Sequence, residues 1–301
     1  MEFNQLENMI KISESDSINQ ASASLFITQS ALNQQLIRLE QELGVKLFNR
    51  SRTQITPTES GRVFLDYAKQ IIRLKRELIN VMGDFSEYKT GVIRLGLPTV
   101  RGYDIFTTVF PRFHRQYPHI QLIPLELSVK RQKLLLSRGD IDLAFMTLAR
   151  GDESNDVFIP LSQEELYLVV PASDPLADAC EGDEISLSQA ADKNFVLIYR
   201  DSTLRLLCDR LFSEADLIPN ILLETSNHQT IANLVSKGYA CTIAPKIYFQ
   251  DTSAVRFFHL PGRPSWSLFA AYRKNSHLSR PMRDLLQLVR EYANPEETAV
   301  S

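Results

Sequence analysis

The hydrophobic periodicity of the chain changes near residue 90. Before about residue 88, apolar side chains recur at intervals of three and four residues, which is the spacing of amphipathic helices. After Gly91, short apolar runs alternate with helical patterns, which indicates strands followed by helices. The length of 301 residues is enough for two or three domains. The sequence therefore predicts a mostly helical N-terminal part and an α/β C-terminal part, joined at residues 89–91.

Composition excludes several other classes of protein. Hydrophobic residues make up 44% and charged residues 23%, as in ordinary globular proteins. No apolar stretch approaches the roughly 20 residues of a membrane span. The first residues are acids and amides rather than a basic patch and an apolar run, so we expect no secretory signal, a cytoplasmic location and no membrane partner. The three cysteines are too few and too widely spaced for a disulfide framework or a metal site.

Two short capped helices are expected after a first helix near residues 3–10. Ser17 can cap a helix over residues 18–25, and Thr28 can cap the next one. The second of these helices carries leucines spaced four, three and four residues apart, and Gly44 ends it. Two capped helices with a tight turn match a helix-turn-helix, whose second helix lies in the major groove of DNA.

The exposed face of this second helix is chemically suited to reading bases. Amide side chains can pair with adenine and arginine can pair with guanine. Residues 45–55 follow as a predicted β-hairpin, a wing whose arginines would meet phosphates or a narrow minor groove. Residues 38–76 hold nine bases and four acids, a net charge of +5 within a chain of net charge −3. The predicted contacts with double-stranded DNA are Thr28, Gln29, Ser30, Asn33, Gln34, Arg38, Arg50 and Arg52.

A set of residues between positions 25 and 61 has the spacing of a known family of DNA-binding domains: Leu25, residues 29–32, Leu39, Glu40, residues 43–45, Leu47, Phe48, Arg50, Thr58 and Gly61. Through these positions, residues 3–90 resemble the N-terminal domain of LysR-type transcriptional regulators without a gap. This chain departs from the family at five positions. The family usually has Ala in place of Ser22, Ser in place of Asn33, Arg in place of Thr53, Leu in place of Pro57 and Ala in place of Ser60. Because Asn33 would face the groove, the operator sequence cannot be carried over from relatives.

A long helix is predicted after Thr58, with a sustained heptad seam. The other positions of this helix are too polar for burial on all sides, so the seam favours a homodimer, which would place two reading helices on adjacent half-sites. The family resemblance implies the same dimer, commonly assembled into a tetramer. The predicted dimerisation residues are Phe64, Tyr67, Ile71, Leu74, Leu78, Val81 and Phe85.

Strand and helix patterns after residue 91 predict two α/β lobes with sheets of parallel type. The pattern restarts near residue 195, and the last strand and helix are expected to return to the first lobe, which gives two crossovers and a cleft. We expect a winged helix-turn-helix domain at 1–58, a linker and dimerisation helix at 59–90, and an effector domain at 91–301. Its first lobe would comprise about 91–162 and 266–301, and its second lobe about 163–265.

The strand-to-helix turns of this part end in small hydroxyl or amide residues, which suit a small anion where helix N-termini converge. About half of them would only cap their own helices. This half also resembles the LysR effector domain, for example in residues 139–144, 168–171 and 174–177, although Asp174 replaces the usual His. The resemblance implies a fold like that of periplasmic binding proteins with an effector between the lobes. The candidate effector contacts are Thr99, Ser128, Thr147, Ser202, Thr203 and His228.

No enzyme motif is present, and neither a cofactor nor a metal is expected. The sequence therefore indicates a DNA-binding regulator that responds to a small, anionic organic metabolite, with RNA polymerase as a candidate partner. One alternative is a redox-responsive regulator that uses Cys208, whose arginine neighbours could lower the thiol pKa. The other is a solute-binding protein, which would leave residues 1–90 unexplained.

Overall fold

The computed structural model describes all residues except 51–53, 86–89, 99–100, 150–155, 180–181 and 295–301. The chain forms two compact units, Met1–Phe85 and Ser86–Ser301. Each unit has its own buried core.

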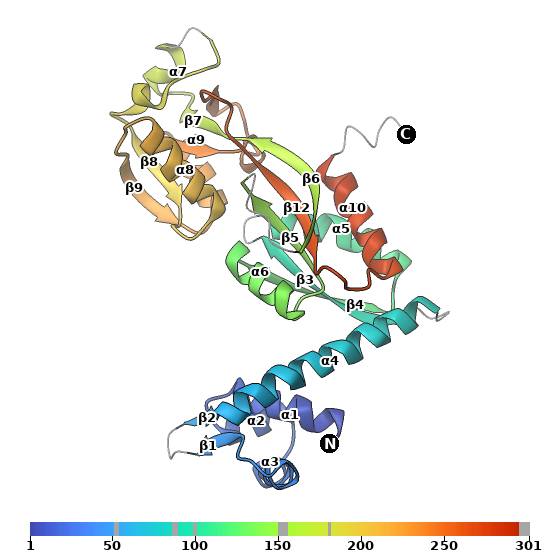
Figure 1. Ribbon diagram of the computed structural model, residues 1–301. Helices are drawn as coiled ribbons and strands as arrows, with labels where there is room; N and C mark the ends of the chain where they lie inside the picture. Colours follow the sequence, from blue (N-terminus) through green and yellow to red (C-terminus); the bar gives the residue numbers. More distant parts are fainter. Residues whose placement is uncertain (51–53, 86–89, 99–100, 150–155, 180–181, 295–301) are drawn as a thin grey trace. The chain divides into compact units, whose positions relative to one another are not determined.

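The N-terminal unit packs three helices around a small apolar core (Figure 1). These are α1 (Phe3–Ser13), α2 (Ile18–Ser24) and α3 (Gln29–Leu43). The predicted caps are confirmed, because Ser17 Oγ accepts from the backbone N–H of Gln20 at 3.1 Å and Thr28 Oγ1 accepts from that of Ala31 at 3.2 Å. Gly44 ends α3 with φ of 70°, a left-handed conformation that glycine adopts without strain.

The predicted hairpin and long helix complete this unit. Strands β1 (Phe48–Arg50) and β2 (Ile55–Pro57) pair antiparallel, with Asn49 opposite Thr56. Helix α4 spans Glu59–Phe85, and Thr58 caps it by accepting from the N–H of Gly61 at 2.9 Å. Thr58 Oγ1 also donates to the carbonyl of Lys46 at 2.6 Å, which joins the start of α4 to the chain that enters the wing.

The first lobe of the second unit is a five-stranded sheet in the order β4-β3-β5-β12-β6. Its strands are β3 (Gly91–Pro98), β4 (Ile120–Leu127), β5 (Leu143–Leu148), β6 (Val157–Glu165) and β12 (Ser265–Tyr272). Its helices are α5 (Gly102–Gln116), α6 (Val129–Arg138) and α10 (Arg280–Ala293).

The second lobe holds a three-stranded sheet in the order β10-β7-β11 and a two-stranded sheet of β8 and β9. These strands are β7 (Tyr167–Pro171), β8 (Asn194–Ile198), β9 (Asn220–Thr225), β10 (Thr242–Ala244) and β11 (Val255–His259). The helices are α7 (Pro175–Ala179), α8 (Thr203–Glu214) and α9 (His228–Ser236), with 3₁₀ turns η1 (Leu187–Ala190) and η2 (Lys246–Tyr248).

The five-stranded sheet is mixed, whereas the sequence pattern indicated sheets of parallel type. Strand β3 is parallel to both β4 and β5, whereas β12 is antiparallel to β5 and β6. The difference arises because the chain crosses between the lobes twice, and β6 and β12 lie beside each other along that path in opposite directions (Figure 1). Sequence reasoning missed β6, which contains Pro160 and ends in four polar residues, and also missed β11.

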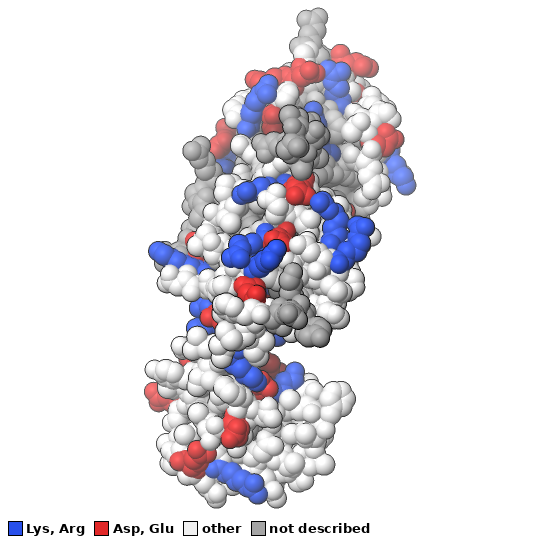
Figure 2. Space-filling model, turned by 90° about the vertical axis from the view of Figure 1, so that its right-hand side faces the viewer, with Lys and Arg blue, Asp and Glu red and all other residues white. Residues whose placement is uncertain are grey.

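The surface carries charges of both signs close together. Figure 2 shows Lys and Arg beside Asp and Glu on the face that it presents. One such pair joins α5 to α10, where Arg112 Nη2 lies 2.8 Å from Glu291 Oε2. Among the described residues, no helix is long and apolar enough to cross a membrane.

Candidate functional site

Helix α3 divides its side chains between a buried face and an exposed face. Leu32, Leu36 and Leu39 are fully buried in the core of the N-terminal unit. The polar candidates Gln29, Ser30, Gln34, Arg38 and the cap Thr28 are exposed, and Asn33 is half-buried at the edge between the two faces. The structure therefore brings these six predicted DNA contacts together on one helix and its cap.

A buried carboxylate ties α3 to the wing. Glu40 is 3% exposed, and its Oε1 accepts from the backbone N–H of Leu47 at 2.9 Å and of Phe48 at 3.4 Å. Its Oε2 accepts from Lys46 Nζ at 2.9 Å. Burial raises the pKa of Glu40, but these hydrogen bonds outweigh burial and leave the pKa below its usual value. Arg52 lies outside the described residues, as does the side chain of Arg50.

The predicted seam of α4 is largely exposed in a single chain. Tyr67, Leu74, Leu78 and Phe85 are exposed, and Phe64, Ile71 and Val81 are partly buried. By contrast, Gly61, Leu65 and Ala68 are buried on the other side of the helix. An exposed apolar row of this length on a soluble helix indicates a surface that another molecule covers.

A pocket lies between the two lobes of the second unit and encloses a cavity of about 30 Å³. Four of the six predicted effector contacts line it, namely Ser128, Thr147, Ser202 and Thr203. Thr99 lies outside the described residues, and His228 is not among the residues that line the pocket. His228 opens α9 and packs against Tyr248, with 5.0 Å between ring centroids and the rings tilted by 48°. Burial lowers the pKa of His228.

Three helices begin at this pocket. Arg101 precedes α5, Ser128 caps α6 and Ser202 caps α8, and all three residues line the cavity. Ser128 and Ser202 accept from the backbone N–H of Arg131 at 3.4 Å and of Arg205 at 3.1 Å. The N-terminus of each helix carries a partial positive charge, so their convergence favours an anion in the pocket.

Sequence reasoning missed the polar base of the pocket. Arg101 is 4% exposed and forms an ion pair with Glu164 of β6. The other oxygen of Glu164 accepts from Trp266 Nε1 of β12 at 2.9 Å. The glycine at position 102 allows α5 to begin close to β3. A Cβ at this position would lie 2.8 Å from Leu97 Cβ of β3, which is too close for two carbon atoms. The start of α5 can thus approach the sheet and place Arg101 inside the lobe.

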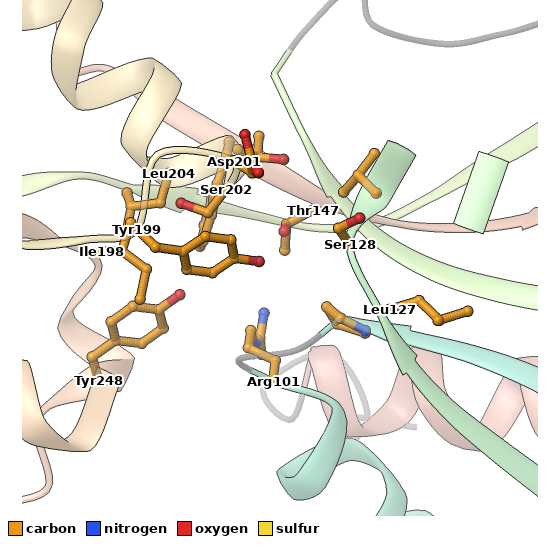
Figure 3. Close-up of a pocket in the computed structure, with 14 residues that line it drawn as sticks. Arg101, Leu127, Ser128, Thr147, Ile198, Tyr199, Asp201, Ser202, Leu204 and Tyr248 are labelled. Atoms are coloured by element: carbon orange, nitrogen blue, oxygen red, sulfur yellow. The ribbon is translucent and has the colours of Figure 1, made fainter. Parts of the chain in front are cut away.

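Two tyrosines and an aspartate were also missed. Tyr199, Asp201 and Tyr248 line the pocket, and Figure 3 shows the hydroxyls of both tyrosines turned toward Arg101 and Thr147. Tyr199 and Asp201 lie in the β8 to α8 turn beside Ser202, so this turn was a usable signal. Tyr248 closes η2, and nothing in the local sequence indicates that it faces the other lobe.

Cys208 does not have the lowered thiol pKa that its arginine neighbours led us to expect. Burial raises the pKa of Cys208 to about 12 and outweighs the lowering effect of Arg205. Arg205 is itself paired with Asp209 at 2.7 Å and Glu224 at 2.8 Å. Burial also raises the pKa of Cys241 to about 12, and Cys180 lies outside the described residues. Within the described part of the chain, no group of three or more His, Cys, Asp or Glu side chains could hold a metal ion.

Two family models match nearly the whole chain. "Bacterial regulatory helix-turn-helix protein, lysR family" matches residues 3–62, and "LysR substrate binding domain" matches residues 86–294. A winged helix-turn-helix followed by a two-lobed effector-binding domain defines a transcriptional regulator. The chain belongs to the LysR family of these regulators. The match of residues 3–62 also shows that the alternative of a solute-binding protein is wrong.

Curated relatives of similar length support this class. The uncharacterized HTH-type transcriptional regulator YcgK of Bacillus subtilis is 28% identical over 307 residues, covering 97% of this chain and 94% of that protein. YybE of the same organism, described in the same words, is 30% identical over 258 residues, covering 85% and 86%. The transcriptional dual regulator GltC, also from Bacillus subtilis, is 27% identical and covers 84% and 83%. These relatives are regulators rather than enzymes.

Solved structures show the same fold. A full-length OxyR variant from Pseudomonas aeruginosa has a TM-score of 0.68 at 19% identity and covers 97% of both chains. CbnR, a LysR family transcriptional regulator, has a TM-score of 0.62 at 21% identity, covering 97% of this chain and 99% of that chain. The effector-binding domain of QuiR in complex with shikimate has a TM-score of 0.56 at 24% identity, covering 69% and 99%. The predicted family and fold class are confirmed.

Proposed function

We propose that this regulator binds a small organic anion between the two lobes of its effector domain, and that the bound anion changes its binding to DNA. The observation that carries the proposal is the convergence of the N-termini of α5, α6 and α8 on one pocket. Three partial positive charges and two serine hydroxyls at one enclosed place favour an anion over a neutral ligand.

A second, wider cavity beside the pocket supports the proposal that the ligand is an anion. It measures about 620 Å³ and shares Ser128, Asp201 and Thr203 with the first pocket. Lys130, Lys133, Arg200 and Arg210 also line it, with Asp201 as the acid among its lining residues. A metabolite larger than the enclosed cavity can extend into this space, and cationic walls raise the local concentration of anions.

For DNA we propose that α3 reads bases through Gln29, Ser30, Asn33, Gln34 and Arg38, while the wing contacts the backbone through Arg50 and Arg52. The exposed side of α3 supports this arrangement. We propose further that α4 pairs with α4 of a second copy. A dimer presents two reading helices to two half-sites, which is how helix-turn-helix proteins reach specific affinity.

The test uses the full chain, because both functions must be measured on one molecule. DNA sites are first selected by the protein from random duplexes. The thermal unfolding midpoint and the affinity for a selected site are then measured with organic acids and with their uncharged amides. A ligand at about 100 times its Kd stabilises the folded state by about 2.7 kcal/mol, which shifts the midpoint visibly.

We expect at least one acid to raise the midpoint and change DNA affinity, and Ser128→Ala and Ser202→Ala to weaken both effects. Equal responses to acids and amides would contradict an anionic effector.

A further inference from the structure

Arg101 has a donor that the protein leaves without an acceptor. Its Nη1 pairs with Glu164, but its Nε–H is buried and has no hydrogen-bond partner among the described residues. Glu164 is itself held by Trp266, so the guanidinium is fixed in one orientation. Nε and the neighbouring Nη2 form a planar fork whose spacing matches the two oxygens of a carboxylate.

Tyr248 presents a second unsatisfied donor at the same place. It is 3% exposed, and its hydroxyl has no hydrogen-bond partner among the described residues. Burial raises the pKa of Tyr248 well above its usual value, so the hydroxyl keeps its proton and can donate it. Figure 3 shows this hydroxyl and the Arg101 guanidinium directed into the same space.

Two buried donors without acceptors are costly, since each loses its hydrogen bonds to water and gains none from the protein. The cavity of about 30 Å³ has room for water in the absence of a ligand, because one water needs about 10 to 15 Å³. A ligand oxygen placed there gains both hydrogen bonds at once. An anionic oxygen gains most, because charge-assisted hydrogen bonds are about twice as strong as neutral ones.

We infer that Arg101 and Tyr248 form a carboxylate subsite, in which the Arg101 fork binds the two oxygens of the ligand and the Tyr248 hydroxyl donates a further hydrogen bond. This inference rests on the proposed function, namely that the cleft binds an organic anion. Glu164 and Trp266 are positioning residues, since they hold Arg101 rather than the ligand.

The rest of the lining defines the class of acid. Apolar walls come from Pro98, Leu127, Val129, Ile198 and Leu204. Thr147, Thr203 and Tyr199 line the same pocket, and their hydroxyls can pair with hydroxyl groups of the ligand. This lining fits an organic acid with an apolar frame and hydroxyl groups.

The test uses acetate as the probe and acetamide as its uncharged isostere, at equal ionic strength set with sodium chloride. A ligand of four heavy atoms in a matched site can reach millimolar affinity or better, so the range extends to about 0.1 M. We expect a saturable rise in the midpoint of the full chain with acetate and none with acetamide. Tyr248→Phe should raise the Kd for acetate roughly tenfold or more, as for a lost hydrogen bond to a charged group.

Ser162→Ala is the matched control. Ser162 Oγ is another buried atom without a partner among the described residues, but Ser162 does not line the interlobe pocket. Neither variant should lower the midpoint without ligand, and only Tyr248→Phe should weaken acetate binding. Arg101→Lys keeps the charge beside Glu164 but lacks the fork, so it should also weaken acetate binding.

The outcomes separate this inference from the proposed function. Equal responses to acetate and acetamide, or an acetate response unchanged in Tyr248→Phe and Arg101→Lys, would overturn the carboxylate subsite. If a larger acid nevertheless binds and changes DNA affinity, the proposed function stands without this subsite. If no acid binds at all, both are wrong, and the cavity holds only water.

Discussion

Single residues at helix starts of this protein have a structural task, and for several of them we also propose a recognition task. Thr28, Ser128 and Ser202 each accept a backbone N–H of the helix that they cap. A hydroxyl has further hydrogen-bonding capacity after accepting one bond, so each cap can still contact a ligand. Replacing such a residue removes both contributions, so the unfolding midpoints of Ser128→Ala and Ser202→Ala without ligand must be measured beside their responses to ligand.

Gln34 offers a cleaner test of DNA reading, because it is exposed and lies in the middle of α3. We expect Gln34→Ala to reduce affinity by about 1 to 3 kcal/mol at particular base pairs only, as for a lost bidentate contact. The measurement is binding to a panel of single-base variants of a selected site. Arg52→Ala serves as the contrast, since it should weaken binding to all sequences and reduce the salt slope by about one. A uniform loss in Gln34→Ala would instead place this side chain on the DNA backbone.

The lowered pKa of Glu40 predicts that the free energy of unfolding of the N-terminal unit depends on pH. The pKa of Glu40 in the folded state is lowered by Lys46 and two backbone N–H groups despite burial. Its stabilisation is therefore complete above the pKa of a free carboxyl, about 4.3, and is lost as the pH falls through the lower folded-state pKa. Glu40→Gln should cost about 1 to 3 kcal/mol at neutral pH, with the difference narrowing in acid.

Denaturant unfolding at several pH values checks this expectation. Glu42→Gln is the control on the same helix, because Glu42 is exposed and its contact with the N-terminal amine is a surface ion pair. A cost for Glu40→Gln that does not change between neutral and acidic pH would show that the carboxylate charge is not what stabilises the wing.

At the scale of elements, α4 carries two apolar faces with different partners. One face packs Leu65 and Ala68 against the rest of the N-terminal unit, and the predicted seam is largely exposed. Leu78→Glu should break the proposed dimer, because an acid at an apolar seam position is desolvated without a partner. Analytical ultracentrifugation should then show a shift from dimer or tetramer toward monomer.

Ile79→Glu is the matched control for this variant. Ile79 is 50% exposed and Leu78 is 59% exposed, but Ile79 lies one position off the seam. The same substitution there should leave the oligomer intact. Dissociation by both variants to the same extent would mean that another face of α4 forms the contact.

Helices that begin after a capping Ser or Thr could be predicted from the sequence, whereas some strands without such a boundary residue could not. Ser17, Thr28, Thr58, Ser128 and Ser202 all cap helices as expected. Strand β6 has a proline inside its apolar first half and a polar second half, so the sequence pattern is weak and its neighbours in the sheet determine its structure. The same holds within the pocket. Ser128, Ser202 and Thr203 were found because they lie in strand-to-helix turns, although Tyr199 and Asp201 of one such turn were missed. Arg101 and Tyr248 reach the pocket only through tertiary packing.

At the scale of the whole molecule, the proposed function requires coupling between the pocket and DNA. If an anion changes DNA affinity by some factor, saturating DNA must change the affinity for the anion by the same factor, typically 5- to 150-fold. We expect calorimetric titration of the full chain with an effector acid to give different Kd values with and without a selected DNA site. An unselected duplex is the control. Equal Kd values would show that the pocket does not regulate DNA binding.

The base of the pocket is assembled from segments that lie far apart in the sequence. The Arg101–Glu164 ion pair joins residues 63 positions apart, and the Trp266–Glu164 hydrogen bond joins residues 102 positions apart. Contacts of such separation form late in folding, because the entropy of closing long loops must be overcome first. During synthesis the helix-turn-helix can fold from local contacts well before Trp266 has left the ribosome. A newly made chain is therefore able to form its DNA-binding unit before it can sense any effector.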